Sequence, residues 1–317
     1  MPAQEFVSAN PAVRRELSRI PTNEALYIGN IVLPYALAPS ERFDYFTAEN
    51  YEIILDDLRA PGALAKIVEL DGPGKNSGTL NEHMLKLVVD QRDIDEAVKH
   101  SDELGGQSLI ATKLARLRRI ILDLEEYRKG ALAFNSANYG GTHKASNVDF
   151  GATGVFGYVD AAREVIFTDF GKMPRVLALG TITFRVLKSN PDIVGRYQRY
   201  GQDKGPINEA TLADFFEVDQ VVVGRAAAKI AGVATRFWTE DSALLAASDT
   251  PATATIDDQA FGVTAYLPYG PEGAQVDVRT DGPKGVERIV EAACAKRYRP
   301  MLLNTNGAYL FTNTDQT

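Results

Sequence analysis

The sequence predicts an α+β protein, and three observations lead to this fold class. Apolar residues recur at spacings of four and three over one long stretch, which is the pattern of a helix with a single apolar face. Short helical and strand-like segments alternate through the middle of the chain. The last fifty residues read as consecutive strands separated by turn signals. A long helix and a terminal sheet on either side of a mixed middle region are typical of α+β proteins.

The first 90 residues predict an arm followed by a two-stranded excursion. Residues 1–42 carry prolines at short intervals, which interrupt helix and remove backbone donors: Pro2, Pro11, Pro21, Pro34 and Pro39. We expect an extended arm that lies on another surface. Strand-like stretches at 45–58 and 84–90 then flank a glycine-rich centre, 71–78, which predicts a ribbon with a flexible tip. Because an isolated two-stranded ribbon is marginally stable, we expect a neighbouring copy to contact it.

One apolar stripe predicts a long helix over about 107–134. Its members are Ile110, Leu114, Leu117, Ile121 and Leu124. Basic residues lie in the first half of this helix and acidic residues in the second: Lys113, Arg116, Arg118 and Arg119, then Asp123, Glu125 and Glu126. The helix dipole does not favour this order. A solvated helix face and a contact with an oppositely charged neighbouring subunit both remain open as explanations.

The rest of the chain predicts shorter elements. A short helix is expected at 94–98, and the segment 135–157, rich in Gly, Ser, Asn and Thr, predicts a long loop. A helix at 161–170, a strand at 175–179, a helix at 181–188 that stops before Asn190-Pro191, and a strand at 220–223 follow. The final strands are expected at 276–280, 286–298, 300–305 and 308–312. Asp281-Gly282-Pro283 predicts a turn, and Asn306-Gly307 predicts a closing hairpin.

Composition excludes several classes of protein. A chain of 317 residues with 45% hydrophobic content can bury a sizeable core, so it is not disordered. The 34 basic against 42 acidic residues give a net charge of -8, which argues against sequence-specific nucleic-acid binding but allows a wall around DNA. The single cysteine excludes an intrachain disulfide and favours folding in a reducing cytoplasm. Neither a signal peptide, nor an apolar run long enough to span a membrane, nor an internal repeat occurs.

No catalytic, cofactor-binding or metal-binding residue is predicted, so we expect a protein that is not an enzyme and needs no cofactor. The glycine-rich segment at 72–77 resembles a phosphate loop, but Asn76 and Leu70 stand where such a loop needs Ser or Thr and Gly. Carboxylates adjacent in sequence point in different directions and form no acid–base pair: Glu125-Glu126 and Asp257-Asp258. The histidines are expected on the surface or in packing, and the lone cysteine and tryptophan in the core: His83, His100, His143, Cys294 and Trp238.

Four segments carry a resemblance to a known family. They are ALYIGNIVLPYALAPSERFDYF near the start, PRVLALGTITFRVLKSNPDIVGRYQ at 174–198, LADFFEVDQVVVGRAA at 212–227 and RPMLLNTNGAYLFTN at 299–313. In this order they resemble the major capsid proteins of tailed bacteriophages, which share the Hong Kong 97-type fold. The resemblance implies an N-terminal arm at 1–42, an E-loop at 43–90, a peripheral domain with a spine helix at 91–149, an axial domain at 150–285, and returning peripheral-domain strands at 286–317.

The same resemblance implies the function. Hexamers and pentamers would form an icosahedral shell in the virion around double-stranded DNA, without sequence-specific binding and without a membrane. Intersubunit contacts are expected at the E-loop tip, from Gly72, Gly74, Lys75 and Asn76. No fused scaffolding segment precedes the arm, so we expect a separate scaffolding protein or a cleaved leader, with a portal and a decoration protein as further partners. Two alternatives stay open: an encapsulin-type nanocompartment shell, and an α+β metabolic enzyme with a ligand pocket in 150–280.

Overall fold

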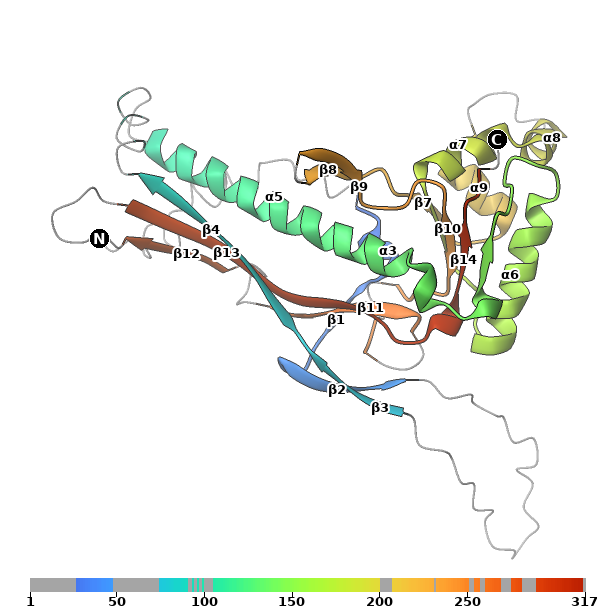
Figure 1. Ribbon diagram of the computed structural model, residues 1–317, viewed down its shortest axis with the longest axis horizontal. Coiled ribbons are helices and arrows are strands. Elements are labelled where there is room, and N and C mark those ends of the chain that lie inside the picture. The colour runs from blue at the N-terminus through green and yellow to red at the C-terminus, as the bar shows by residue number, and fades with distance from the viewer. Residues whose placement is uncertain are drawn as a thin grey trace, which may run out of the picture.

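A long helix and a long strand set the axis of the molecule. The computed structural model describes residues 27–47, 74–90, 105–199, 207–230, 232–250, 254–256, 260–268, 275–280 and 289–315, together with Asp93, Glu96 and Lys99. Helix α5 (Gly105–Ala133) runs beside strand β13 (Ile289–Leu302) along one half of the molecule, and shorter helices gather around a compact sheet at the other end (Figure 1). The α+β prediction is therefore confirmed.

A five-stranded sheet, here called the long sheet, lies under α5. Its order is β1 (Tyr35–Leu37), β11 (Gly262–Leu267), β13 and β12 (Gln275–Thr280), and β4 (Asn81–Asp90) pairs with the other edge of β13. The β1–β11 pair is parallel and the others are antiparallel. Leu117 and Ile121 of α5 pack against Cys294 of β13, with Leu85 and Leu87 of β4 beside them. The predicted apolar stripe of the helix thus covers this sheet.

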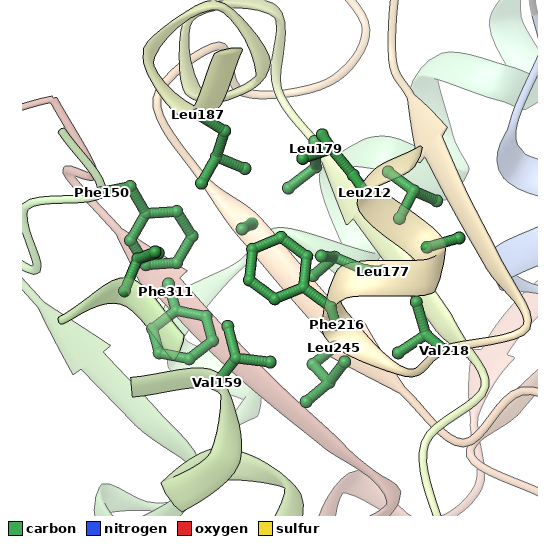
Figure 2. Close-up of a cluster of buried hydrophobic side chains, with 14 of the residues drawn as sticks. Phe150, Val159, Leu177, Leu179, Leu187, Leu212, Phe216, Val218, Leu245 and Phe311 are labelled. Carbon is green, nitrogen blue, oxygen red and sulfur yellow. The ribbon is translucent and has the colours of Figure 1, made fainter. Parts of the chain in front are cut away.

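A second five-stranded sheet, the compact sheet, is covered on both faces. Its order is β5 (Lys144–Ser146), β14 (Ala308–Thr312), β10 (Ala243–Ala246), β6 (Val176–Leu179) and β7 (Gln220–Val223). Four helices cover one face: α6 (Val155–Phe170), α7 (Thr181–Ser189), α8 (Pro191–Arg199) and α9 (Glu209–Phe216). Figure 2 shows the apolar core between them, where Phe216 lies among Leu177, Leu245 and Val159. Because the other face is buried as well, β6 and β10 contain apolar residues only.

The other face of the compact sheet packs against α5 and the start of the described chain. Leu244 of β10 and Leu310 of β14 lie in one cluster with Phe134, which follows α5, and with Trp238. The short helix α3 (Gly29–Val32) belongs to the same cluster. This cluster joins the two sheets, because α5 also covers the long sheet.

Asn190 both ends α7 and begins α8. Its side-chain oxygen accepts the backbone N–H groups of Asp192 (2.8 Å) and Ile193 (3.2 Å), and its amide group donates to the carbonyls of Phe150 and Ala152. An asparagine at the N-cap followed by proline at the first helical position is a strong helix start. The predicted stop before Asn190-Pro191 is confirmed, and the same two residues also start the next helix.

Residues 27–37 are part of the body, although they were expected to belong to an extended arm on another surface. Val32 and Leu33 are fully buried, and β1 adds to the long sheet in register with β11, Tyr35 opposite Thr264. The Thr264 N–H donates to the carbonyl of Pro34 at 2.8 Å. Strand pairing and burial therefore hold this segment on its own chain. Residues 1–26 lie outside the described residues.

The predicted two-stranded excursion exists with different partners. Strand β2 (Arg42–Thr47) pairs with β3 (Gly74–Thr79), which contains much of the glycine-rich segment that was expected to form the tip. The stretch at 84–90, expected as the second strand of the ribbon, belongs to β4 and pairs with β13. The predicted pairing of the two stretches is therefore wrong. Residues 48–73 and most of 91–104 lie outside the described residues.

The closing hairpin predicted at Asn306-Gly307 is wrong. Thr305–Gly307 form a short 3-10 turn, η5, in which the Asn304 side chain accepts the N–H of Asn306 at 3.0 Å. The chain passes there from the long sheet to the compact sheet, because β13 pairs with β4, β11 and β12 whereas β14 pairs with β10 and β5. The strands predicted at 286–298 and 300–305 are one strand, β13, from Ile289 to Leu302.

Strand pairing also departs from the expected domain boundary at 285. Strand β14, expected with the returning strands 286–317, lies in the compact sheet. Strands β11 and β12, expected within 150–285, lie in the long sheet. The reason is that each strand follows its hydrogen-bonding partner, and these partners alternate along the chain. Helix α6 begins at Val155, six residues before the predicted start, after Gly154 with a φ of +94°.

Gly130 allows α5 to approach the segment that follows strand β9 (Val233–Arg236). A Cβ atom at Gly130 would lie 2.2 Å from the carbonyl oxygen of Phe237, so alanine there should destabilise the protomer by about 1–3 kcal/mol through overpacking. Urea unfolding of the unassembled protomer measures this change. Gly195 in α8 is the matched control, because a Cβ atom there would meet no other atom within 4 Å, and Gly195→Ala should stabilise by about 0.5–1 kcal/mol. Equal effects at both positions would contradict the steric explanation.

Candidate functional site: a buried charged cluster and two exposed ribbons

The predicted contact residues lie on one strand where the structure describes them. Gly74, Lys75 and Asn76 belong to β3, opposite Thr47, Phe46 and Tyr45 of β2. Gly72 lies outside the described residues. The backbone of these three residues is therefore held in a strand pair and not in a turn. Asn76 is exposed at the surface of this ribbon, which we call the β2–β3 ribbon.

The base of the β2–β3 ribbon is anchored on the body. The Phe43 ring covers Gly78 on the opposite strand, where a Cβ would lie 2.7 Å from the ring, so glycine is needed there. Phe43 and Leu80 are buried against Val263 and Met301 of the long sheet. Arg297 of β13 forms an ion pair with Glu41. The base is thus fixed, and the far end points away from the body (Figure 1).

A second ribbon lies near the C-terminal half of α5. Strands β8 (Ala227–Ile230) and β9 (Val233–Arg236) pair only with each other among the described strands, and Gly232 in the turn has a φ of +84°. Most of the described side chains of this β8–β9 ribbon are exposed, and Val233 is 66% exposed. A groove of about 470 Å³ lies between this ribbon and α5, with Tyr127, Ala131 and Phe134 on the helix side. Sequence reasoning did not predict this ribbon.

Beneath α5, a charged cluster is buried at the junction with the long sheet. The carboxylate of Glu125 pairs with the ammonium groups of Lys129, 2.8 Å away, and of Lys296 on β13. Tyr35 of β1 donates its hydroxyl to the same carboxylate and accepts a hydrogen bond from Lys296 at 2.7 Å. Lys129 also donates to the side-chain oxygen of Asn30 at 2.6 Å. This cluster therefore joins α5, β1, β13 and α3.

Glu126, the next residue, faces a different set of groups. It accepts the indole N–H of Trp238 at 2.7 Å and the backbone N–H groups of Ile28 (2.8 Å) and Gly29 (3.0 Å). These backbone groups lie at the start of α3, where a helix leaves its first N–H groups without partners. Glu126 thus holds α3 and the Trp238 loop against α5. Glu125 and Glu126 have different hydrogen-bond partners, but both are buried and both line one cavity, which departs from the prediction that they do not face a common cleft.

The pKa values of the two buried carboxyl groups shift in opposite directions. Burial acts to raise the pKa of Glu125, but the ammonium groups of Lys129 and Lys296 outweigh it and hold that pKa below its ordinary value. Burial raises the pKa of Glu126, which the hydrogen bonds from Trp238 and Gly29 only partly oppose. Burial likewise raises the pKa of the Tyr35 hydroxyl. The two pKa values differ mainly because the positively charged Lys129 and Lys296 contact Glu125 directly.

The cluster leaves no free group for chemistry in the described part of the chain. Every buried side-chain nitrogen or oxygen there has a hydrogen-bond partner. The adjoining cavity of about 260 Å³ is lined by the same residues, with Arg118 and Leu122. In the described ranges, no three His, Cys, Asp or Glu side chains are arranged to hold a metal ion, and no helix is long and apolar enough to cross a membrane. The arrangement joins α5, β1, β13 and α3.

The remaining predicted residues are packing residues where they are described. His143 is buried and contacts the Asp169 carboxylate (2.9 Å) and the Ala308 carbonyl (3.2 Å). His83 packs against the Tyr298 ring, 4.4 Å between centroids. Cys294 and Trp238 are buried, as predicted. His100 and Asp257-Asp258 lie outside the described residues.

The charge order along α5 is explained in part within the chain. Lys113 forms an ion pair with Asp93 (3.7 Å), and Arg119 with Asp123 (3.9 Å). The acidic Glu125 and Glu126 are buried, so the second half of the helix is not a solvated face at these positions. Arg116 is exposed.

Comparison with known proteins gives two sequence relatives. The major capsid protein of Burkholderia phage BcepMu is 26% identical over 209 residues, which cover 64% of this chain and 64% of that protein. The major capsid protein of Pseudomonas phage JBD67 is 29% identical over 212 residues, 64% of this chain and 65% of that protein. The matches thus span just under two thirds of the relatives' length. No family model matches the sequence.

Solved structures match the fold over nearly the whole chain. A phage-related protein from Bordetella bronchiseptica RB50 has a TM-score of 0.72 at 18% identity and covers 97% of this chain and 98% of its own. A protein assigned as a prophage capsid protein, from Escherichia coli CFT073, has a TM-score of 0.56 at 11% identity, with 98% of each chain covered. In sequence, the chain is similar to phage major capsid proteins over just under two thirds of its length. The expected Hong Kong 97-type fold is confirmed for this chain.

The similarity to these capsid proteins also bears on the expected absence of catalysis. Both sequence relatives are major capsid proteins, which are structural proteins of the virion. The alternative of a metabolic enzyme is therefore not supported. The candidate functional surfaces of this chain are its two exposed ribbons.

Proposed function

We propose that this protein is a major capsid protein, the repeating unit of an icosahedral shell that is arranged as hexamers and pentamers and encloses the double-stranded DNA of a tailed phage. The observation that carries the proposal is that both sequence relatives are major capsid proteins. The net charge of -8 supports enclosure without tight binding, because an acidic wall repels a polyanion. The shell protein would be part of the virion and would be folded in the host cytoplasm.

The proposed subdomains follow the sheets. We assign the long sheet with α5 to the peripheral domain and the compact sheet with α6 to α9 to the axial domain. Residues 43–90 form the proposed E-loop, in which β2 and β3 pair and β4 returns into the long sheet. We keep Gly72, Gly74, Lys75 and Asn76 as proposed intersubunit contacts. A scaffolding protein, a portal and a decoration protein are the proposed partners during assembly.

Weak contacts repeated around a closed lattice would hold such a shell. Each interface would bury apolar surface and pair backbone groups, and the sum over many interfaces would give stability through multivalency. A ring of identical subunits requires two different complementary surfaces on each subunit. The β2–β3 ribbon and the β8–β9 ribbon lie on opposite sides of the long axis, which supports this role (Figure 1).

Electron microscopy of the full-length chain, expressed with its neighbouring genes, tests the proposed function. Shells that contain double-stranded DNA are the expected result. Shells filled with a host enzyme would favour a nanocompartment in place of a phage head. Discrete dimers or tetramers with no shells would contradict a shell function altogether.

The double variant Lys75→Ala and Asn76→Ala tests the proposed contact on the β2–β3 ribbon. We expect a folded protomer, because the strand pairing of β3 uses backbone groups. The assembled shells should dissociate at a temperature several degrees lower than unsubstituted shells, measured by light scattering during heating. Gln198→Ala, an exposed position on α8, serves as the control and should leave this temperature unchanged. If the unsubstituted, double-variant and control shells dissociate at the same temperature, Lys75 and Asn76 do not contribute to the interface.

A further inference from the structure

We propose that the β8–β9 ribbon and the groove beside it form a docking surface for a second copy of this chain. The inference rests on the proposed shell function and names one surface through which neighbouring subunits meet. Residue identity, exposure, local charge and the groove each contribute to it.

The β8–β9 ribbon receives little stabilisation from the other strands of its own chain. Its two strands pair with each other and with no other strand in the described ranges. A two-stranded ribbon is marginally stable alone, and its open edges present unpaired backbone groups. Small apolar side chains face solvent on it, among them Ala227, Val233 and Ala234. A surface of this kind is stabilised when another protein surface covers it.

The charge of this segment is opposite to that of the whole chain. Residues 225–236 contain three basic residues, Arg225, Lys229 and Arg236, and no acidic residue. The chain as a whole carries a net charge of -8. Because Arg225 and Arg236 pair with carboxylates of their own chain, the exposed ammonium group of Lys229 is the group left for an acidic side chain of a second copy, and complementary charge favours that contact.

A protein partner fits this surface better than DNA does. Arg225 is paired with Glu209, and Arg236 with Glu240 at 2.9 Å. In the described part of the chain, Lys229 is the one basic side chain of the ribbon with no carboxylate within ion-pair distance. Because affinity for DNA grows with the number of phosphates neutralised, one free ammonium group supports little binding.

The groove supplies a preformed recess beside the ribbon. Its volume is about 470 Å³, and its walls are Tyr127 and Ala131 of α5 with Phe134, which follows α5, on one side and residues 234–240 on the other. The floor is fixed, because Phe237 and Trp238 are buried against α5. Tyr127 is 36% exposed at the rim, and an aromatic side chain next to a packed recess is a common anchor in protein interfaces.

The geometry favours contact between unlike surfaces of two copies. A closed ring needs one surface on each flank of the subunit. The β8–β9 ribbon lies on the flank opposite the β2–β3 ribbon in Figure 1. A neighbouring subunit would therefore contact the β8–β9 ribbon through a different surface and not through its own β8–β9 ribbon.

Val233→Asp tests the docking surface in the full-length chain expressed with its neighbouring genes. The side chain is 66% exposed, so the protomer should keep its thermal midpoint, while an unpaired charge in the contact should reduce the yield of shells at least tenfold. Val233→Thr, which keeps the shape and strand preference, should assemble within twofold of the unsubstituted chain. Met173→Asp, half-exposed and far along the chain from the ribbon, controls for added charge.

A photo-crosslinking residue at position 233 identifies the occupant directly. Covalent dimers of this chain in purified shells support the proposal. Crosslinks to DNA or to a different protein in place of dimers would overturn it. Normal shell yield with Val233→Asp would also overturn it while leaving the shell function intact. If the unsubstituted chain forms no shells, the proposed function fails, and the inference fails with it.

Discussion

Glu126→Ala is expected to destabilise the protomer by about 3 kcal/mol or more, because several buried donors lose their acceptor together. These donors are the indole N–H of Trp238 and the backbone N–H groups of Ile28 and Gly29. Residues 27–33 should loosen from α5 as a result. Urea unfolding of the unassembled protomer measures the loss, followed by the fluorescence of Trp238, the single tryptophan of the chain.

Two control variants separate this effect from a simple loss of charge. Glu126→Gln keeps one oxygen as an acceptor for the indole and the Ile28 N–H, so we expect a cost of about 1 kcal/mol. Glu164→Gln on the exposed face of α6 removes a charge without touching a buried donor and should change stability by less than about 0.5 kcal/mol. If all three variants unfold at the same urea concentration, Glu126 does not anchor these groups.

Glu125→Leu is the second large expected effect. Removal of this carboxylate leaves the buried ammonium of Lys129 without its counter-charge, which should cost about 3–5 kcal/mol. The double variant Glu125→Leu with Lys129→Met removes both members of the i,i+4 pair and should recover a large part of that loss, because apolar replacements of a buried pair are often tolerated. Urea unfolding at pH 7 measures both. A double variant as unstable as the single one would show that the pair is not the source of the cost.

Acid should act on the two neighbouring carboxyl groups with opposite signs. The pKa of Glu125 is lower in the folded chain, so its contribution is present above the ordinary glutamate pKa and is lost as the pH falls through the lowered value. The pKa of Glu126 is raised, so its protonation adds stability as the pH falls, and this gain disappears as the pH rises through the raised value. Urea midpoints between pH 3 and 7 should therefore fall more steeply in acid for the unsubstituted protomer than for Glu125→Leu.

Local pattern predicts the elements of this fold better than it predicts their partners. The stripe through Leu114, Leu117 and Ile121 predicts α5, and all three side chains are buried. The partner of β4, however, is β13, about two hundred residues later in the chain. Spacing along the sequence gives no information on such a pair, so β4 was assigned to a nearby strand. To assign strand partners that are far apart in the sequence, one must know which face of each strand is buried.

Pro300 explains why β13 was predicted as two strands. A proline lacks the N–H that a central strand needs, which favours a break in the pattern. The N–H of Thr264, opposite Pro300, points to the carbonyl of Pro34 on the other side of β11. Thr264 and Pro300 are therefore a pair without mutual hydrogen bonds, and β4 ends its pairing at Tyr298. Proline at this position removes no ladder hydrogen bond.

The buried charged cluster was missed although its signal is present in the sequence. The buried face of α5 continues from Ile121 at four-residue steps through Glu125, Lys129 and Ala133, all of which are buried. A glutamate and a lysine four residues apart in line with an apolar stripe indicate a buried ion pair. The third member, Lys296, comes from β13, so its position depends on the tertiary fold and no local pattern predicts it.

The pairing of β13 with β4 has a mechanical consequence. The two strands run antiparallel over an unbroken register from Ile289 opposite Asp90 to Tyr298 opposite Asn81. A force that pulls these strands past each other loads their hydrogen bonds side by side, so many must break together before the strands slide. A force that peels one strand from the other breaks them one after another and meets less resistance. The long sheet is therefore strongest against tension along its own strands, which is the direction in which pressure from within would stretch a thin wall that lies parallel to them.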